Sequence, residues 1–298
     1  MPTEARLIAR VAVLVIALLT TVVAQGKPPS PAGRLIAASD LASRLNDSRL
    51  VVLHVVDRTS SYDEGHIPGA RPIRYDRVAV DGTSGLGAEL PPLAALEQVF
   101  EEAGVSDASQ VVVYGNTVTA ARVFFTLDVA GHDQVMLLDG GLRAWQAERR
   151  VIASGPPPAV KRGTWTPRLQ AARMATAQWI QQEAARVALV DVRPDDEFTG
   201  ADGGMGGAHV PGHIDGARQL PWNTLVGPEG RFLPADQLRA KLGAAGADGG
   251  KPVVSYCMVG MRASVVYFVA RHLGFDAKLY DGSIIDWGQR GLPTKRGR

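Results

Sequence analysis

The stretch that decides the fold of this 298-residue chain is Val253-Val254-Ser255-Tyr256-Cys257-Met258-Val259-Gly260-Met261-Arg262-Ala263-Ser264. An apolar, β-branched run ends at one thiol, a short loop with a glycine follows, and a helical pattern then begins. Cys257 is therefore expected at the N-terminal end of a helix, where backbone N–H groups and the helix dipole favour a negative charge. A thiolate held there is a better nucleophile at neutral pH than a free cysteine.

Cys257 is the only cysteine of the chain and has no partner for an intrachain disulfide. Two interpretations follow: a reactive thiol, or a buried cysteine that acts as a small apolar side chain. The six histidines show no metal-ligand spacing, and no phosphate-binding Gly-Lys-Ser/Thr loop occurs. We therefore expect neither a metal nor another cofactor.

The composition is that of a globular protein, with 46% hydrophobic and 21% charged residues. A chain of this length predicts about two domains. The formal net charge is +2, and no basic stripe with interleaved aromatic residues occurs. This pattern argues against nucleic acid as a partner.

The N-terminus has the layout of a secretory signal. Arg6 and Arg10 precede an uncharged apolar stretch at residues 11–24, which ends in small residues before Gln25. The stretch is short for a membrane span, which needs about 20 apolar residues. We expect residues 1–25 to be a signal peptide of an exported, periplasmic or secreted protein. The alternative is an uncleaved anchor, with membrane contact only through residues 11–24.

Two halves of the chain repeat one pattern. Residues 111–114 match 253–256, residues 139–141 match 281–283, and Trp145 matches Trp287, each at a spacing of 142 residues. Residues 65–70 match 212–217 at a spacing of 147 residues, and the glycine-rich run 203–207 accounts for the difference. A constant spacing predicts a tandem duplication, with domains at about 35–153 and 175–295 and a Pro/Gly-rich linker at 154–165.

Each half alternates strand and helix patterns, which predicts an α/β fold with a mainly parallel sheet and flanking helices. The expected strands are 50–56, 111–114, 135–138, 187–191, 253–256 and 277–280, and the expected helices are 92–103, 120–130, 235–244 and 262–273. Ligands of such sheets lie beyond the carboxyl ends of the strands, where Cys257 is expected.

These residues resemble the rhodanese family of sulfurtransferases in its tandem two-domain form, from about Leu35 to Pro293. The resemblance rests on residues 65–70, on Asp191-Val192-Arg193 followed by Glu197-Phe198, on the Cys257 loop, and on Asp281-Gly282-Ser283 with Trp287. It implies a catalytic C-terminal domain and an inactive N-terminal domain. The chain agrees, because Tyr114-Gly115 stands where the second half has Tyr256-Cys257.

The resemblance implies that Cys257 takes a sulfur atom from a small donor such as thiosulfate and holds it as a persulfide. The sulfur then passes to a thiophilic acceptor such as cyanide or a thiol. The loop residues Met258, Val259, Gly260 and Met261 are expected to place their backbone amides around this anion. Arg262 is expected to bind the anionic donor, and the alternative is an arginine that forms only a salt bridge at the helix start.

The Cys-x4-Arg spacing is one residue shorter than the Cys-x5-Arg loop of tyrosine phosphatases, which disfavours phosphatase chemistry. Asp191 and Arg193 are expected either to polarise the site or, with more weight, to pair with each other. His213 recurs as His66 in the half without a nucleophile, so we expect it to serve the fold.

The loop also departs from the family pattern. Met258 and Val259 are neither basic, as in thiosulfate-preferring members, nor small, as in mercaptopyruvate-preferring members. Glu197 stands where the mercaptopyruvate type has an arginine, and its carboxylate would repel 3-mercaptopyruvate, so thiosulfate or a persulfide is the expected donor. Ile284 stands where a tryptophan is common.

Two alternatives stay open beside the thiosulfate sulfurtransferase. One is a 3-mercaptopyruvate sulfurtransferase. The other is a non-catalytic persulfide carrier or thiol sensor with a protein partner, for which the apolar loop side chains Met258, Val259 and Met261 would offer a docking surface for a protein or lipophilic thiol.

Overall fold

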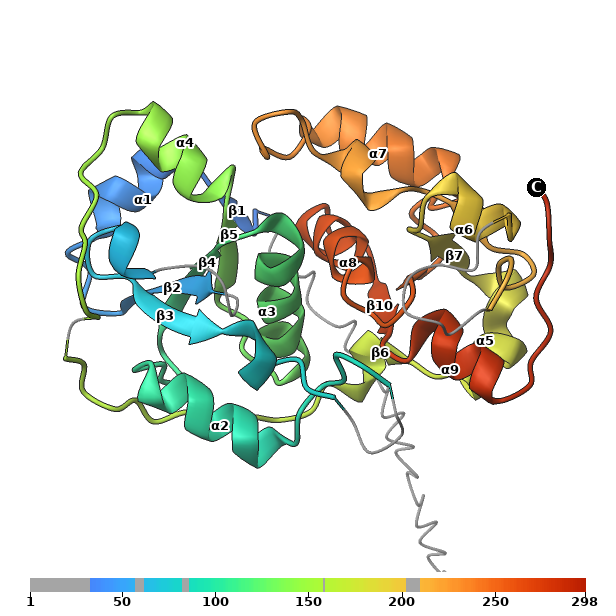
Figure 1. Cartoon of the computed structure of the whole chain (residues 1–298), viewed down its shortest axis with the longest axis horizontal. Coiled ribbons are helices and arrows are strands. Elements are labelled where there is room, and N and C mark those ends of the chain that lie inside the picture. The colour runs from blue at the N-terminus through green and yellow to red at the C-terminus, as the bar shows by residue number, and fades with distance from the viewer. Residues whose placement is uncertain (1–32, 57–61, 82–85, 158, 202–209) are drawn as a thin grey trace, which may run out of the picture.

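The computed structural model describes residues 33–56, 62–81, 86–157, 159–201 and 210–298. It contains two five-stranded parallel sheets in tandem, with strand orders β1-β5-β4-β2-β3 and β6-β10-β9-β7-β8 (Figure 1). The first sheet comprises β1 (Leu35–Ile36), β2 (Leu50–Val56), β3 (Arg71–Arg74), β4 (Gln110–Tyr114) and β5 (Val135–Leu138). The second comprises β6 (Met174–Ala175), β7 (Ala188–Asp191), β8 (Arg218–Gln219), β9 (Val253–Tyr256) and β10 (Ala277–Tyr280). The predicted tandem α/β architecture is thus confirmed.

The α-helices of the described residues are α1 (Ala38–Arg44), α2 (Leu93–Glu102), α3 (Thr117–Val129), α4 (Gly141–Ala147), α5 (Ala177–Glu183), α6 (Asp195–Thr199), α7 (Ala235–Ala244), α8 (Ala263–His272) and α9 (Ser283–Gln289). Short 3-10 turns occupy Tyr62–Glu64, Tyr75–Arg77, Ala171–Arg173, Ala184–Arg186 and Trp222–Leu225. Helix α3 begins three residues earlier than predicted, because the Asn116 side chain accepts a hydrogen bond from the Val118 N–H at 3.0 Å and caps the helix there.

The central strands are buried on both faces, as parallel strands covered by helices must be. Every residue of β2, β7 and β9 is buried. In the first half, α2 and α3 pack on one face of the sheet, and α1 and α4 pack on the other. In the second half, α7 and α8 share one core cluster, and α5 and α9 share another.

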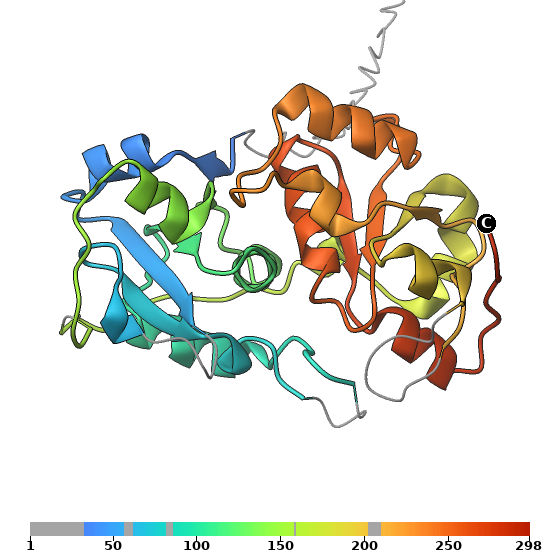
Figure 2. The ribbon, with the colours of Figure 1, turned by 45° about the horizontal axis from the view of Figure 1, so that its top comes forward.

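The two halves are packed together through α3 and α8, which lie side by side at the centre of the molecule (Figures 1 and 2). Phe124 meets Phe268 edge to face with ring centroids 4.9 Å apart, and Phe125 meets Tyr267 in the same way at 5.1 Å. One continuous hydrophobic cluster contains buried residues of both halves. The carboxyl ends of both sheets are thereby held in a fixed relation to each other.

A buried charge cluster reinforces this interface. The Asp128 carboxylate on α3 is fully buried and pairs with Arg34 at 3.3 Å, Arg173 at 3.2 Å and Arg271 at 3.0 Å. The hydroxyl of Tyr267 on α8 donates to the same carboxylate at 2.5 Å. One residue of the first half therefore joins the segment before β6 and helix α8 of the second half.

The predicted signal segment, residues 1–25, lies outside the described residues. Within the described ranges, no helix has both the length and the apolar character needed to cross a membrane.

Candidate active site

Cys257 lies directly after β9, at the carboxyl end of the second sheet, and is 1% exposed. Its backbone N–H donates to the Ser283 hydroxyl at 3.1 Å, and its carbonyl accepts from the Ile284 N–H at 3.1 Å. Hydrogen bonds to the first residues of α9 therefore hold both the backbone N–H and the carbonyl of Cys257, the nucleophile predicted from sequence.

The loop that follows Cys257 presents free N–H groups. Several of its carbonyls accept hydrogen bonds: Met258 O from the Ile285 N–H, Gly260 O from the Ser264 hydroxyl, and Met261 O from the Ser264 N–H. No group in the described part of the chain accepts a hydrogen bond from the backbone N–H groups of residues 258–262. A run of unpaired amides at the start of α8 is a cradle for an anion.

Gly260 is required by the shape of this loop. Its φ of +82° lies in the left-handed region, where residues with a side chain are strained. A Cβ there would lie 2.6 Å from Asp281 Oδ1 and 2.8 Å from the Asp281 carbonyl oxygen. Only glycine fits where the loop turns over the end of β10.

Arg262 and Glu197 form a two-point ion pair beside the thiol. Arg262 precedes α8, and its Nη1 and Nη2 donate to the two carboxylate oxygens of Glu197 on α6, each at 2.8 Å. Burial disfavours the Arg262 cation, but the hydrogen bonds to Glu197 and the nearby Cys257 sulfur outweigh this and raise the pKa of Arg262. The structure thus shows the helix-start salt bridge and also places the guanidinium next to Cys257.

Asp191 and Arg193 pair with each other behind the nucleophile. Both side chains are fully buried, with 2.6 Å between Arg193 Nη2 and Asp191 Oδ2. The Arg193 guanidinium also donates to the Gly212 carbonyl at 2.7 Å and lies 6.0 Å from the Tyr256 ring centroid. This pair ties the end of β7 to the segment before β8, and burial raises the pKa of Tyr256 well above its usual value.

His213 is engaged with the fold. Its ring stacks on Phe198 at 3.8 Å, and its Nδ1 lies 3.0 Å from the Phe198 carbonyl oxygen. In the other half His66 stacks on Tyr62 at the same centroid distance. The same packing occurs in the half that lacks the cysteine.

Ser283 is a site residue that the sequence reasoning did not assign. Its φ of +52° is left-handed, and its hydroxyl accepts from the Cys257 N–H while it donates to the Tyr280 carbonyl at 2.8 Å. The equivalent residue of the first half, Gly141, has a φ of +55°. The sequence signal that could have identified Ser283 is a serine at a position where the other half has glycine. The serine adds a hydroxyl that the first half lacks at this position.

Two substitutions separate the strain of Ser283 from its hydrogen bond. Ser283→Ala keeps the left-handed side-chain cost and removes the hydroxyl, so we expect a loss of about 1–3 kcal/mol in the free energy of unfolding. Ser283→Gly relieves the strain, worth roughly 1 kcal/mol, and should be clearly more stable than the alanine variant. Urea unfolding of the three proteins measures this order. Equal stability of the two variants would contradict the strain assigned to Ser283.

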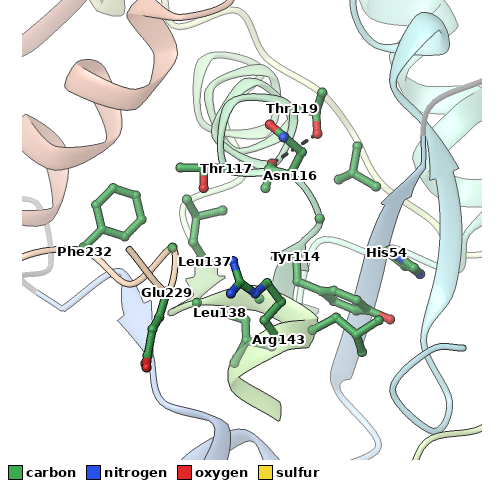
Figure 3. A pocket seen from close by; sticks show the side chains of 17 residues that line it. His54, Tyr114, Asn116, Thr117, Thr119, Leu137, Leu138, Arg143, Glu229 and Phe232 are labelled. Carbon is green, nitrogen blue, oxygen red and sulfur yellow. Dashed lines mark hydrogen bonds between the residues drawn. The ribbon is translucent and has the colours of Figure 1, made fainter. Parts of the chain in front are cut away.

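The first half has an open cavity where the second half has the Cys257 loop (Figure 3). The cavity has a volume of about 350 Å³ and lies at the carboxyl ends of β2, β4 and β5. Gly115 lines it at the position equivalent to Cys257, and a Cβ on Gly115 would lie 2.7 Å from the Val55 carbonyl oxygen. The backbone around Gly115 therefore has no room for a cysteine unless β2 shifts, which agrees with an inactive first half.

Sequence comparison matches both halves to one family, described as the rhodanese-like domain, over residues 37–148 and 176–290. The chain therefore belongs to the rhodanese family, with two such domains in tandem. Membership, the repeated domain and the parallel α/β fold inferred from the motifs are confirmed.

Named relatives are similar over nearly their whole length. A thiosulfate sulfurtransferase of Corynebacterium glutamicum is 34% identical over 278 residues, covering 86% of this chain and 87% of that protein. The sulfur carrier protein TtuD of Thermus thermophilus is 32% identical over 278 residues, covering 88% and 96%. The crystal structure of the 3-mercaptopyruvate sulfurtransferase SseA from Escherichia coli superposes with a TM-score of 0.74 at 26% identity, covering 85% and 99%. The protein is a sulfurtransferase of the rhodanese family.

Proposed function

We propose that this protein takes the outer sulfur of thiosulfate and transfers it, through a Cys257 persulfide, to a thiophilic acceptor such as cyanide or a thiol. The observation that supports this best is the unpaired run of backbone amides at residues 258–262, directly after the buried thiol. A persulfide anion on Cys257 would be the acceptor that these amides lack.

The reaction balances without another reactant. The Cys257 thiolate attacks the outer sulfur of thiosulfate, a new S–S bond forms, and the donor S–S bond breaks with its electron pair leaving as sulfite. The acceptor then attacks the outer sulfur of the persulfide, and Cys257 leaves as a thiolate. The five amides and Arg262 stabilise negative charge on the transferred sulfur and on the departing sulfite.

The ion pair of Arg262 with Glu197 holds the guanidinium beside Cys257, where it can bind an anionic donor such as thiosulfate. The pairing uses two of the five N–H donors of the guanidinium, so other donors stay available for the Cys257 sulfur and for a sulfonate group. The Glu197 carboxylate, 8% exposed, fixes the guanidinium in this position.

Thiocyanate formation tests the proposal. With cyanide as acceptor we expect turnover with thiosulfate, a lower kcat/KM with 3-mercaptopyruvate, and none with Cys257→Ser. A Glu197→Gln variant should change kcat/KM for the two donors in the same direction, because both are anions that meet the same carboxylate. A wild-type protein that uses only 3-mercaptopyruvate would overturn the donor assignment.

A second candidate function is a sulfur carrier that delivers the persulfide to a partner protein. Val259 and Met261 line a groove of about 670 Å³ with apolar and polar residues of the first domain, among them Val118, Asp76 and Asp81, and this groove offers a partner protein a surface beside the loop. The Thermus relative named as a sulfur carrier supports this reading. In this case the loaded protein would transfer sulfur slowly to cyanide and to small thiols. Fast multiple turnover with these acceptors would argue against it.

We also propose that the protein is exported through residues 1–25. The proposal rests on the arginines, apolar stretch and small residues of that segment. Expression of the full chain in a bacterial host should give a periplasmic protein that begins close to residue 26. An intact N-terminus in the cytoplasmic fraction would exclude cleavage.

A further inference from the structure

An arginine of the inactive domain reaches the catalytic loop. Arg122 on α3 is fully buried and forms an ion pair with Asp281, which follows β10 in the other domain. Its Nη2 lies 3.2 Å from Asp281 Oδ2 and donates to the Ala88 carbonyl at 2.6 Å. The guanidinium also lies 5.0 Å from the Phe125 ring centroid. Contacts within the first domain thus hold Arg122 in place, and its guanidinium neutralises the Asp281 carboxylate of the second domain.

This ion pair lies directly under the loop of free amides. A Cβ on Gly260 would be 2.6 Å from Asp281 Oδ1 and 3.2 Å from Arg122 Nη1. Asp281 is also two residues before Ser283, whose hydroxyl accepts from the Cys257 N–H. Loop and nucleophile therefore both rest on the segment that Arg122 anchors.

The duplication supplies an internal comparison. The Leu90 N–H donates to Asp281 at 3.0 Å, and the Phe232 N–H donates to Asp139 at 2.8 Å. Leu90 corresponds to Phe232, and Asp139 corresponds to Asp281, each at the spacing of 142 residues. Each domain therefore makes the same hydrogen bond to the other.

The equivalence ends at the arginine. Ser264 stands 142 residues after Arg122, and Asp139 is met instead by Arg231, at 3.5 Å and with its side chain 35% exposed. The fully buried arginine occurs at the copy of the contact that adjoins the thiol.

We propose that Arg122 is a positioning residue of the sulfur-transfer site, through which the inactive domain holds Asp281 and the Cys257 loop and cancels the Asp281 charge beneath it. This proposal rests on the persulfide chemistry of Cys257. Without Arg122, a carboxylate with little access to water would oppose the negative charge that the loop has to hold. Without Asp281, the guanidinium would favour that charge.

The charged groups of the described elements around the loop include Arg262 before α8, Glu197 on α6, the Asp191–Arg193 pair after β7, and Arg122 with Asp281. Asp76 and Asp81 of the first domain line the groove beside Val259 and Met261. Among these, replacing Arg122 or Asp281 changes the charge on the domain-interface side and leaves the Arg262–Glu197 pair intact. The two replacements change the local charge in opposite directions and should therefore shift the pH profile in opposite directions. A purely structural role would not predict opposite shifts.

The test measures the rate of persulfide loading from thiosulfate against pH. For Arg122→Met we expect the midpoint of the profile to move up by roughly 0.5–1 pH unit, with loading below the midpoint about 3- to 10-fold slower. For Asp281→Asn the midpoint should move down, and the double variant should return close to the wild-type midpoint. Asp139→Asn, at the matching contact far from the thiol, should leave the midpoint unchanged.

Shifts in the same direction for both single variants, or no shift in either, would overturn the proposal. If Arg122→Met does not fold, the direction of the midpoint shift in Asp281→Asn and in the double variant still tests the proposal. Failure of the wild-type protein to load sulfur from any donor would instead refute the proposed function, so the two failures are distinguishable.

Discussion

Replacing Asp128 with asparagine is expected to lower the free energy of unfolding by about 3–5 kcal/mol, because it leaves buried cations without their carboxylate. Arg34, Arg173 and Arg271 pair with this side chain, and their own side chains are 3%, 8% and 5% exposed. The cluster joins α3 to the second domain, so the loss should appear as a large decrease in the midpoint of urea unfolding.

Asp133→Asn is the matched control. Asp133 pairs with Arg173 at 2.9 Å, but its side chain is 63% exposed, and such pairs contribute about 0–1 kcal/mol. If the two substitutions changed stability equally, the buried cluster would not be what holds the domains together.

Replacing Arg262 with methionine is expected to reduce kcat/KM for thiosulfate by roughly 100-fold, similar to the loss of one oxyanion-binding group. The change removes the guanidinium beside Cys257 and also leaves the Glu197 carboxylate, 8% exposed, without its partner. Thiocyanate formation at several thiosulfate concentrations measures the effect.

The double variant Arg262→Met with Glu197→Gln separates these two contributions. It should recover part of the lost kcat/KM, because the uncompensated carboxylate is gone while the donor-binding group is still missing. An unchanged kcat/KM in Arg262→Met would show that Arg262 serves only as a salt-bridge partner at the start of α8.

The fold could be predicted because its signals are local and repeated. β-branched runs such as 111–114 and 253–256 recur at one spacing, and β2, β7 and β9 are buried along their whole length. The start of α3 was misplaced because the capping role of Asn116 depends on one side-chain hydrogen bond that periodicity does not report.

The nucleophile could also be placed from the sequence, because a strand that ends at a lone cysteine fixes where the thiol lies. The contacts around the thiol could not be predicted from the sequence. Glu197 and Arg262 are 65 residues apart, and Arg122 and Asp281 are 159 residues apart. Residue patterns report local structure and burial, whereas these pairs arise only when α6, α8 and the domain interface are packed.

The central claim is that Cys257 carries the transferred sulfur. The most direct measurement is the intact mass of the protein after incubation with thiosulfate and again after cyanide. The mass should rise by one sulfur atom and return to its original value, and Cys257→Ser should show neither change. A wild-type protein that gains no sulfur from thiosulfate or from a persulfide donor, or a Cys257→Ser variant that still gains it, would contradict the account.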